Sequence, residues 1–368
     1  MSKSISEKQL KYAVALFIIG TNLLIKNLYQ FTKNESWIAV VMATAAGLVI
    51  VSIYGALAGN HSGCTLFEIN ERVFGVAGGK ILSSVYLFYF LTLAVFNTQD
   101  LGSFVHNYVL KETPLNLILA TFLFICVYAA RKGADKMTQY GAFILFVYLI
   151  VTFFNTVLLI SKMRLTNFLP MLTIPFKNQL LSAQFMTMLP FSEVLVFLML
   201  VRHIAKPKSA GKALRRGLLI GAAVIMLLFI RNIAVLGGYA LHTSNPTFNT
   251  IRLIDVGDIF TRLEIINAVF QITLLFFKIS ILVYAFTAGI GQLFNIRENG
   301  ILTLISGALI LVCANFFLSS EGEKTQWFSV AATYGMFFLF ILPSLTLIVS
   351  KIRKSADTKG TADMQKEQ

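Results

Sequence analysis

Long apolar stretches fill this chain of 368 residues and constrain its fold more than any other feature. A helix that crosses a bilayer needs about 20 mostly apolar residues. Hydrophobic residues make up 57% of the chain and charged residues 13%, a composition that a soluble domain could not cover with polar surface. The sequence therefore predicts an all-α integral membrane protein. The ten predicted spans lie at 10–30, 38–58, 81–106, 116–130, 140–160, 184–201, 217–241, 264–290, 300–319 and 328–350.

The net charge of +14 follows the predicted topology. With ten spans, most of the 31 lysines and arginines fall in segments on the same side of the membrane as the N-terminus. Cytoplasmic segments carry such an excess, so both termini are predicted to be cytoplasmic. Because topology accounts for the charge, membrane lipids are an expected partner and nucleic acid is not.

The spans form one predicted membrane domain, 1–354, followed by a polar tail, 355–368, that is too hydrophilic to bury a core and is predicted to be disordered. A capping box formed by Thr65 and Glu68 predicts a short helix between the second and third spans. It is expected to lie at the cytoplasmic interface or to pack beneath the bundle.

The segment 162–183 is predicted to lie on the outer side, yet it is strongly apolar and contains Pro170 and Pro175. An outer loop of this composition indicates either a folded cap over the bundle or a contact with another protein.

Signals for catalysis or metal binding are missing from the sequence. Cys64, Cys126 and Cys313 lie far apart, without the spacing of metal ligands. The sequence contains no zinc signature, nucleotide-binding loop or serine elbow. We therefore expect no enzyme, no metal and no cofactor.

Charged residues inside the predicted spans are the best indication of function. Lys26, Glu193, Arg231 and Lys278 lie within spans, and Asp100 lies near the outer end of the third span. An ionisable residue inside a membrane normally faces a cavity, a partner or a transport path. Three cations against one or two acids leave positive charge unbalanced. An anionic ligand could balance it, a lysine could be neutral, or Glu193 could form a structural ion pair with Arg231 or Lys278.

Ten spans divide into two groups of five, at about 10–160 and 184–350. Many transporters consist of two such repeats with inverted topology, in which the first helix of each repeat is broken at the binding site. Pro190 predicts a break in the sixth span, directly before Ser192 and Glu193. The first span contains polar residues from Gly20 onwards but no proline, so a break there is less strongly indicated.

Several strings in the chain resemble one family in their order. They are TLFEIN at 65–70, KETPLNLILATF at 111–122, NFLPML at 167–172 and DIFTRLEIINAVFQI at 258–272. With the ten-span plan, they resemble the B subunits of the nutrient germinant receptors of bacterial endospores. These subunits are ten-span members of the amino acid–polyamine–organocation superfamily.

The resemblance implies two inverted five-helix repeats in the spore inner membrane, working with a membrane-anchored A subunit and a lipoprotein C subunit. It implies sensing of a small nutrient, such as an amino acid, between the first and sixth spans. The residues that correspond to this pocket are Thr21, Asn22, Pro190, Phe191, Ser192 and Glu193.

The first span departs from the family pattern, because a Gly-Ala-Gly-like stretch followed by proline is replaced by IIGTNLLIKNLYQF. Lys26 could supply the charge partner that those backbone groups usually provide, or the ligand could differ. Asp100, Arg231 and Lys278 are candidate coupling or gating charges. In related transporters a sodium ion lies between the first and eighth spans, and the ammonium of Lys278 could take its place.

Two alternative functions remain open on the sequence. The chain could be a proton-coupled amino acid transporter that acts alone. It could also be a scaffold subunit that assembles a receptor without binding a ligand, which would suit the altered first span.

Overall fold

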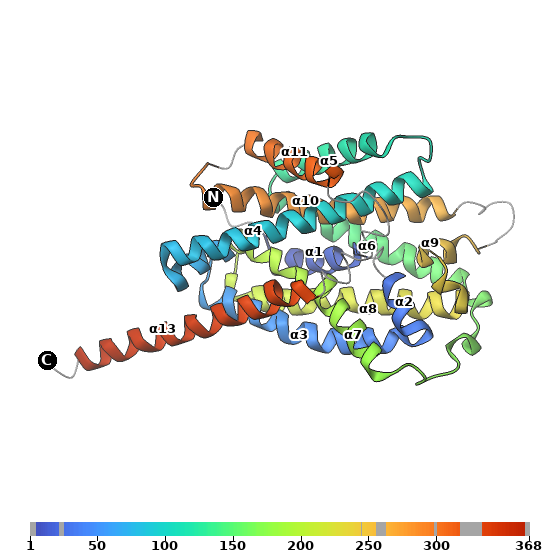
Figure 1. Ribbon diagram of the computed structural model, residues 1–368, viewed down its shortest axis with the longest axis horizontal. Coiled ribbons are helices and arrows are strands. Elements are labelled where there is room, and N and C mark those ends of the chain that lie inside the picture. Colours follow the sequence, from blue (N-terminus) through green and yellow to red (C-terminus); the bar gives the residue numbers. More distant parts are fainter. Residues whose placement is uncertain are drawn as a thin grey trace.

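The computed structural model describes residues 5–21, 26–243, 245–254, 263–297, 300–316 and 333–364. These residues form a helical bundle (Figure 1). These residues form no β-strand. The main helices are α1 (Glu7–Ile19), α2 (Lys26–Thr32), α3 (Ser36–Asn60), α4 (Leu66–Tyr108), α5 (Leu115–Arg131), α6 (Ala134–Leu158), α7 (Phe176–Met186), α8 (Ala210–Leu236), α9 (Pro246–Ile251), α10 (Leu263–Leu293), α11 (Gly300–Phe316) and α13 (Leu342–Met364).

The predicted spans all have helical counterparts. Seven helical segments among the described residues are long and apolar enough to cross a membrane, and α5 and α11 are shorter apolar helices. The remaining predicted span, 10–30, is divided between α1 and α2. The predicted all-α membrane class is confirmed.

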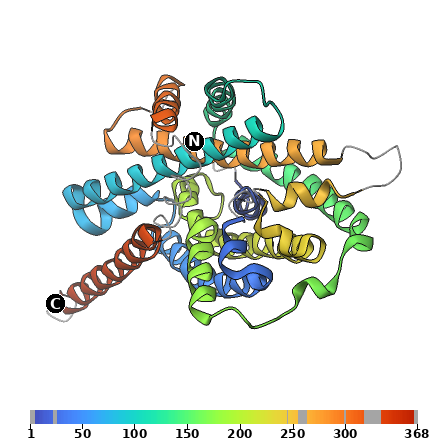
Figure 2. The ribbon, with the colours of Figure 1, turned by 45° about the vertical axis from the view of Figure 1, so that its right-hand side comes forward.

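Helix α1 lies inside the bundle, where it packs against α8, α6 and α10 (Figures 1 and 2). Its residues from Ala13 to Ile19 are all buried, as expected for a helix that is apolar on every face. Helices α4 and α10 run side by side, and α3 packs along α8. The end of the bundle away from both termini, called the distal end here, is formed by α2, α9 and the loop that precedes α7.

Local sequence signals explain where the helices begin and bend. The predicted capping box at Thr65 is present, since the Glu68 backbone N–H donates to the Thr65 hydroxyl and the Glu68 carboxylate accepts from the Thr65 N–H. Helix α4 turns sharply at Gly75, whose φ of 78° suits glycine. The predicted short helix is therefore the first part of α4, and it folds back so that Gly79 lies against the backbone of Glu71.

The predicted disorder of the polar tail, 355–368, stays a prediction. Helix α13 continues through 355–364 to Met364, and residues 365–368 lie outside the described part. This end of α13 projects away from the bundle (Figure 1).

Glycines allow the central helices to approach closely. A Cβ atom added at Gly55 of α3 would lie 2.6 Å from the Cα of Gly211 in α8, and one at Gly217 would lie 2.7 Å from Val14 of α1. Small residues at such contacts are typical of membrane helices, whose association depends on close packing.

Gly55→Val is expected to destabilise the protein by about 1–3 kcal/mol, because its side chain would push α3 away from the backbone of α8. Gly59→Val is the matched control, since it makes the same change one turn later, where no atom lies within 4 Å of an added Cβ. Thermal unfolding of the two purified variants in detergent measures the difference. Equal melting temperatures would contradict the close α3–α8 contact.

Candidate functional site

The first span is broken, which the sequence had left open. Helix α1 ends at Ile19, and the N–H of Thr21 donates to the carbonyl of Ile18 over 3.2 Å. The next helix begins at Lys26. The predicted pocket residue Asn22 lies outside the described residues, and so does the side chain of Lys26. Thr21 is buried at the end of the first half-helix.

The sixth span is also broken, at the position that Pro190 predicts. Helix α7 ends at Met186, and Leu189 has non-helical φ and ψ values of −128° and 103°. A 3-10 segment, Ser192–His203, continues the span. The Ser192 hydroxyl donates to the carbonyl of Thr187 over 2.7 Å and so satisfies backbone at the break.

The side chains around this second break are buried. Pro190, Phe191, Ser192 and Glu193 are all enclosed, and the Phe191 side chain lies against Gly47 of α3. The break therefore places the Glu193 carboxylate inside the bundle, away from lipid.

Lys278 joins the two breaks. Its Nζ lies 2.5 Å from Oε2 of Glu193 and also donates to the hydroxyl of Thr21. The ammonium lies 4.9 Å from the centroid of the Phe17 ring, within the range of a cation–π contact. Lys278 is 0% exposed and Glu193 is 1% exposed. We call these four side chains, Phe17, Thr21, Glu193 and Lys278, the charge centre.

The structure shows which buried cation pairs with Glu193. The sequence allowed either Lys278 or Arg231, and the structure pairs Glu193 with Lys278. A buried carboxylate and a buried ammonium compensate each other, which makes both tolerable in a region without water. The pair also ties the middle of α10 to the broken ends of the first and sixth spans.

The other two candidate charges lie elsewhere. Arg231 is 1% exposed in α8, and its Nη2 and Nε donate to the side-chain oxygen of Asn232 over 3.2 and 3.4 Å. Asp100 is partly exposed on α4, where it takes part in an interaction.

The end of the bundle near the N-terminus is closed by several polar contacts. Ile5 pairs with the backbone at the end of the sixth span, donating to the carbonyl of His203 over 3.1 Å and accepting from the N–H of Ala205 over 3.0 Å. The His203 ring lies 2.8 Å from the hydroxyl of Tyr284 in α10. These contacts join the segment before α1 to the end of the sixth span, and the sixth span to α10.

Glu35 is a buried carboxylate that sequence reasoning missed. It is 1% exposed, and its Oε1 accepts from the backbone N–H groups of Thr173 and Ile174 over 2.6 and 3.3 Å and from the Thr173 hydroxyl over 3.1 Å. Its Oε2 accepts from the side chain of Gln179 over 2.9 Å. The sequence gives no signal for this role, because Glu35 lies in a short polar connection of ordinary composition.

The apolar loop at 162–183 is a folded cap over the distal end. Asn34 donates to the carbonyls of Phe168 and Pro170, and Asn167 donates to the carbonyl of Ala234 at the end of α8. Several apolar side chains of this segment nevertheless remain exposed, including Leu165 and Leu172.

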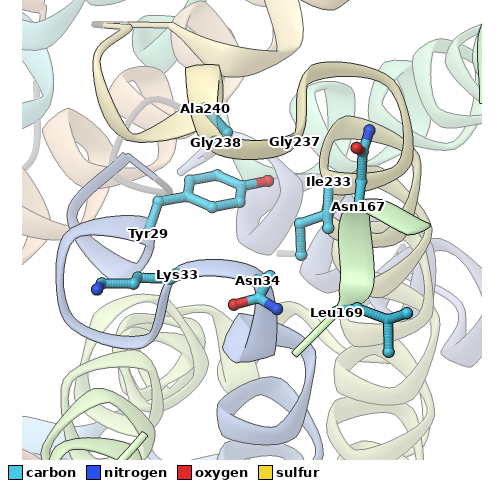
Figure 3. A pocket seen from close by; sticks show the side chains of 9 residues that line it. All are labelled: Tyr29, Lys33, Asn34, Asn167, Leu169, Ile233, Gly237, Gly238 and Ala240. Carbon is cyan, nitrogen blue, oxygen red and sulfur yellow. The ribbon is translucent and has the colours of Figure 1, made fainter. Parts of the chain in front are cut away.

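A pocket of about 160 Å³ opens beneath this cap (Figure 3). Its lining comes from α2 and the 3-10 turn Lys33–Glu35 after it, from the cap, and from the end of α8 and the 3-10 turn Gly237–Leu241 that follows it. The lining residues are Tyr29, Lys33, Asn34, Asn167, Leu169, Ile233, Gly237, Gly238 and Ala240.

Comparison with known proteins gives a consistent result. A family model described as "Spore germination protein" matches residues 4–322. The chain is 24% identical to spore germination protein KB of Bacillus subtilis (strain 168), over 98% of each chain. It is also 24% identical to spore germination protein YndE of the same organism, over 89% of this chain and 90% of YndE.

The fold is similar to that of a solved transporter. Mhp1, a nucleobase-cation-symport-1 family transporter solved in a closed conformation with bromovinylhydantoin bound, matches 94% of this chain and 77% of its own length. The TM-score is 0.73 at 15% sequence identity, so this likeness concerns the fold alone.

Proposed function

Because this chain belongs to the spore germination protein family of permease-like membrane proteins, we propose that it is the nutrient-sensing subunit of a spore germinant receptor. The single observation that carries the proposal is the meeting of two broken spans at a buried charge pair, Lys278 with Glu193. Broken helices at mid-membrane depth are where transporters of inverted-repeat architecture bind their ligands.

The ligand is a small zwitterion such as an amino acid. Its carboxylate takes the place of Glu193 at the ammonium of Lys278, while its own ammonium pairs with the released Glu193 carboxylate. This exchange keeps every buried charge compensated, so the ligand avoids the cost of separating the pair. Thr21, Pro190, Phe191 and Ser192 surround the ligand.

Replacement of Glu193 by the ligand carboxylate at Lys278 explains how ligand binding could change the conformation of the protein. Lys278 holds α10 to both breaks, so a ligand that replaces one of its partners changes how the half-helices pack. A ligand shifts a conformational equilibrium only through such a difference in contacts between states. Arg231 and Asp100 tune this equilibrium as gating charges.

The role is that of a receptor subunit rather than an enzyme. The chain works with A and C subunits in the spore inner membrane, with both termini in the cytoplasm and lipid around the bundle. Its relatives named as spore germination proteins and its permease-like fold support this role.

A transporter that acts alone is the second candidate, since the fold is that of a transporter. Proton movement between Glu193 and Lys278 would then couple to amino acid uptake. Uptake of labelled amino acids into proteoliposomes that contain this chain alone separates the two candidates, because a sensor takes up none.

Germination of spores carrying Glu193→Gln tests the proposal, with receptor level measured by immunoblot. We expect the receptor to be present with a lost or altered nutrient response, because the amide still accepts a hydrogen bond from Lys278 but cannot compensate a ligand ammonium. Glu112→Gln, an exposed position between the third and fourth spans, is the matched control and is expected to germinate normally. An unchanged nutrient profile for Glu193→Gln at normal receptor level would contradict the proposal and favour a non-binding scaffold.

A further inference from the structure

Arg231 carries a buried positive charge that no carboxylate among the described residues balances. Among the described residues it donates only to the neutral side-chain oxygen of Asn232, through two long hydrogen bonds of 3.2 and 3.4 Å. No carboxylate of the described part lies within 4 Å of its guanidinium. A guanidinium has five N–H donors, and a buried charge without a counter-charge is costly. Arg231 therefore has the capacity to bind an anion.

Two tyrosine side chains lie within electrostatic range of this guanidinium. Tyr29 of α2 and Tyr148 of α6 are close enough to interact with Arg231 electrostatically, and both are buried. The Tyr29 hydroxyl faces the Asn232 side chain but makes no hydrogen bond of good geometry within the described residues. Within the described part of the chain it is thus a second buried polar group without a hydrogen bond of good geometry, pointing to a ligand independently of the charge.

Of these residues, Tyr29 alone lines the pocket at the distal end. Its ring lines the pocket, and Figure 3 shows the ring crossing the cavity with the hydroxyl directed toward Ile233. Lys33 lies at the same pocket and is exposed. A lysine at the rim raises the local concentration of anions. The pocket volume of about 160 Å³ is similar to that of a cavity of roughly 150 Å³ that holds benzene, so a ligand of about six non-hydrogen atoms fits.

The site is distinct from the charge centre. Helices α1 and α8 run in the same direction, with Val14 against Gly217 and Ile18 against Gly221. Thr21 is therefore level with a position about seven residues before Arg231, which corresponds to about 10 Å along α8. The ring of Tyr29 lies 4.9 Å from that of Phe229, centroid to centroid, which places Tyr29 close to the part of α8 that carries Arg231.

We propose that Arg231 and Tyr29 form an anion-binding site, reached from the distal pocket, that takes a small carboxylate or an inorganic anion. A carboxylate suits the planar guanidinium, which can donate two parallel hydrogen bonds to it, and the Tyr29 hydroxyl donates a third. The inference does not depend on nutrient binding at the charge centre.

Thermal unfolding of the purified chain in detergent tests the site with acetate as the probe, in a chloride-free gluconate buffer. Gluconate is too large for the pocket and keeps the ionic strength constant. We expect a saturable rise in melting temperature with acetate. Tyr29→Phe removes one oxygen from a buried ring, so it is expected to fold and to need about tenfold more acetate. Arg231→Gln is expected to lose the acetate response.

A chloride titration identifies the class of anion, and a Glu193→Gln variant separates this site from the charge centre. A chloride titration with the same saturable response assigns the site to inorganic anions, whereas a response to acetate alone assigns it to carboxylates, and both outcomes support it. Glu193→Gln is expected to keep the acetate response. The proposal is overturned if wild-type protein shows no saturable response, if Tyr29→Phe responds like wild type, or if Glu193→Gln abolishes the response. None of these three results bears on nutrient sensing by Glu193, which the germination assay measures separately.

Discussion

Lys278→Met is expected to lower the free energy of unfolding by about 3–5 kcal/mol, the largest effect of any single substitution considered. The change leaves the Glu193 carboxylate buried at 1% exposure with its cation removed. It also removes the donor to the Thr21 hydroxyl and the cation above the Phe17 ring. Reversible unfolding in mixed micelles, followed by far-ultraviolet circular dichroism, measures the loss.

Two controls isolate the charge from the side-chain volume. Lys111→Met makes the same substitution at an exposed position outside the bundle and is expected to change stability by less than about 0.5 kcal/mol. The double variant Lys278→Met with Glu193→Gln removes both charges and is expected to recover most of the stability, since replacing a whole buried pair is often close to neutral. If Lys278→Met were as stable and as responsive to nutrients as wild type, neither the buried pair nor a cation-replacing role for Lys278 could hold.

Glu35→Ala is expected to release the distal cap and to increase trypsin cleavage at Lys177 by at least about 100-fold. The carboxylate accepts four hydrogen bonds from the cap, and a hydrogen bond to a charged group contributes about 1.5–3 kcal/mol. Cleavage of a locally opened segment follows the population of its open form, so a loss of about 3 kcal/mol gives an increase of this size. Time courses of limited proteolysis on purified protein measure it.

Glu112→Ala, which removes an exposed carboxylate from another loop, is the control and is expected to leave cleavage unchanged. Glu35→Gln keeps the side-chain volume and one acceptor oxygen, so its cleavage rate is expected to fall between wild type and Glu35→Ala. A cap that resists trypsin equally in all four proteins would show that other contacts, such as those of Asn34 and Asn167, hold it.

The spans and one of the two breaks could be predicted from sequence, because their physical causes are local. Apolar length fixes the helices that cross the membrane, and Pro190 cannot continue a helix without disturbing the residue before it. The break in the first span has no such marker. Only the density of polar residues from Gly20 onwards indicated it, and α1 does end at Ile19.

The pairing of charges could not be predicted, because it depends on how the helices rotate and cross. Lys278 and Arg231 were equivalent partners for Glu193 on the sequence, and the segment Ser192–His203, which packs against α10, places Glu193 at Lys278. Glu35 was missed for the same reason, since its partners lie about 140 residues away in sequence. The family resemblance, in contrast, rested on strings that are short and local, and the family is confirmed.

The central claim is that a ligand binds where the two broken spans meet. The most direct test is whether the nutrient protects a cysteine introduced there from labelling by a thiol reagent. Ser192→Cys is made in a chain whose three cysteines, Cys64, Cys126 and Cys313, are replaced by alanine, with Lys111→Cys as the exposed control. Labelling by a small thiol reagent is timed in membranes with and without each amino acid. We predict that the nutrient that triggers germination slows labelling at position 192 and leaves position 111 unchanged. Equal labelling rates at position 192 with and without that nutrient would contradict a ligand site at the charge centre.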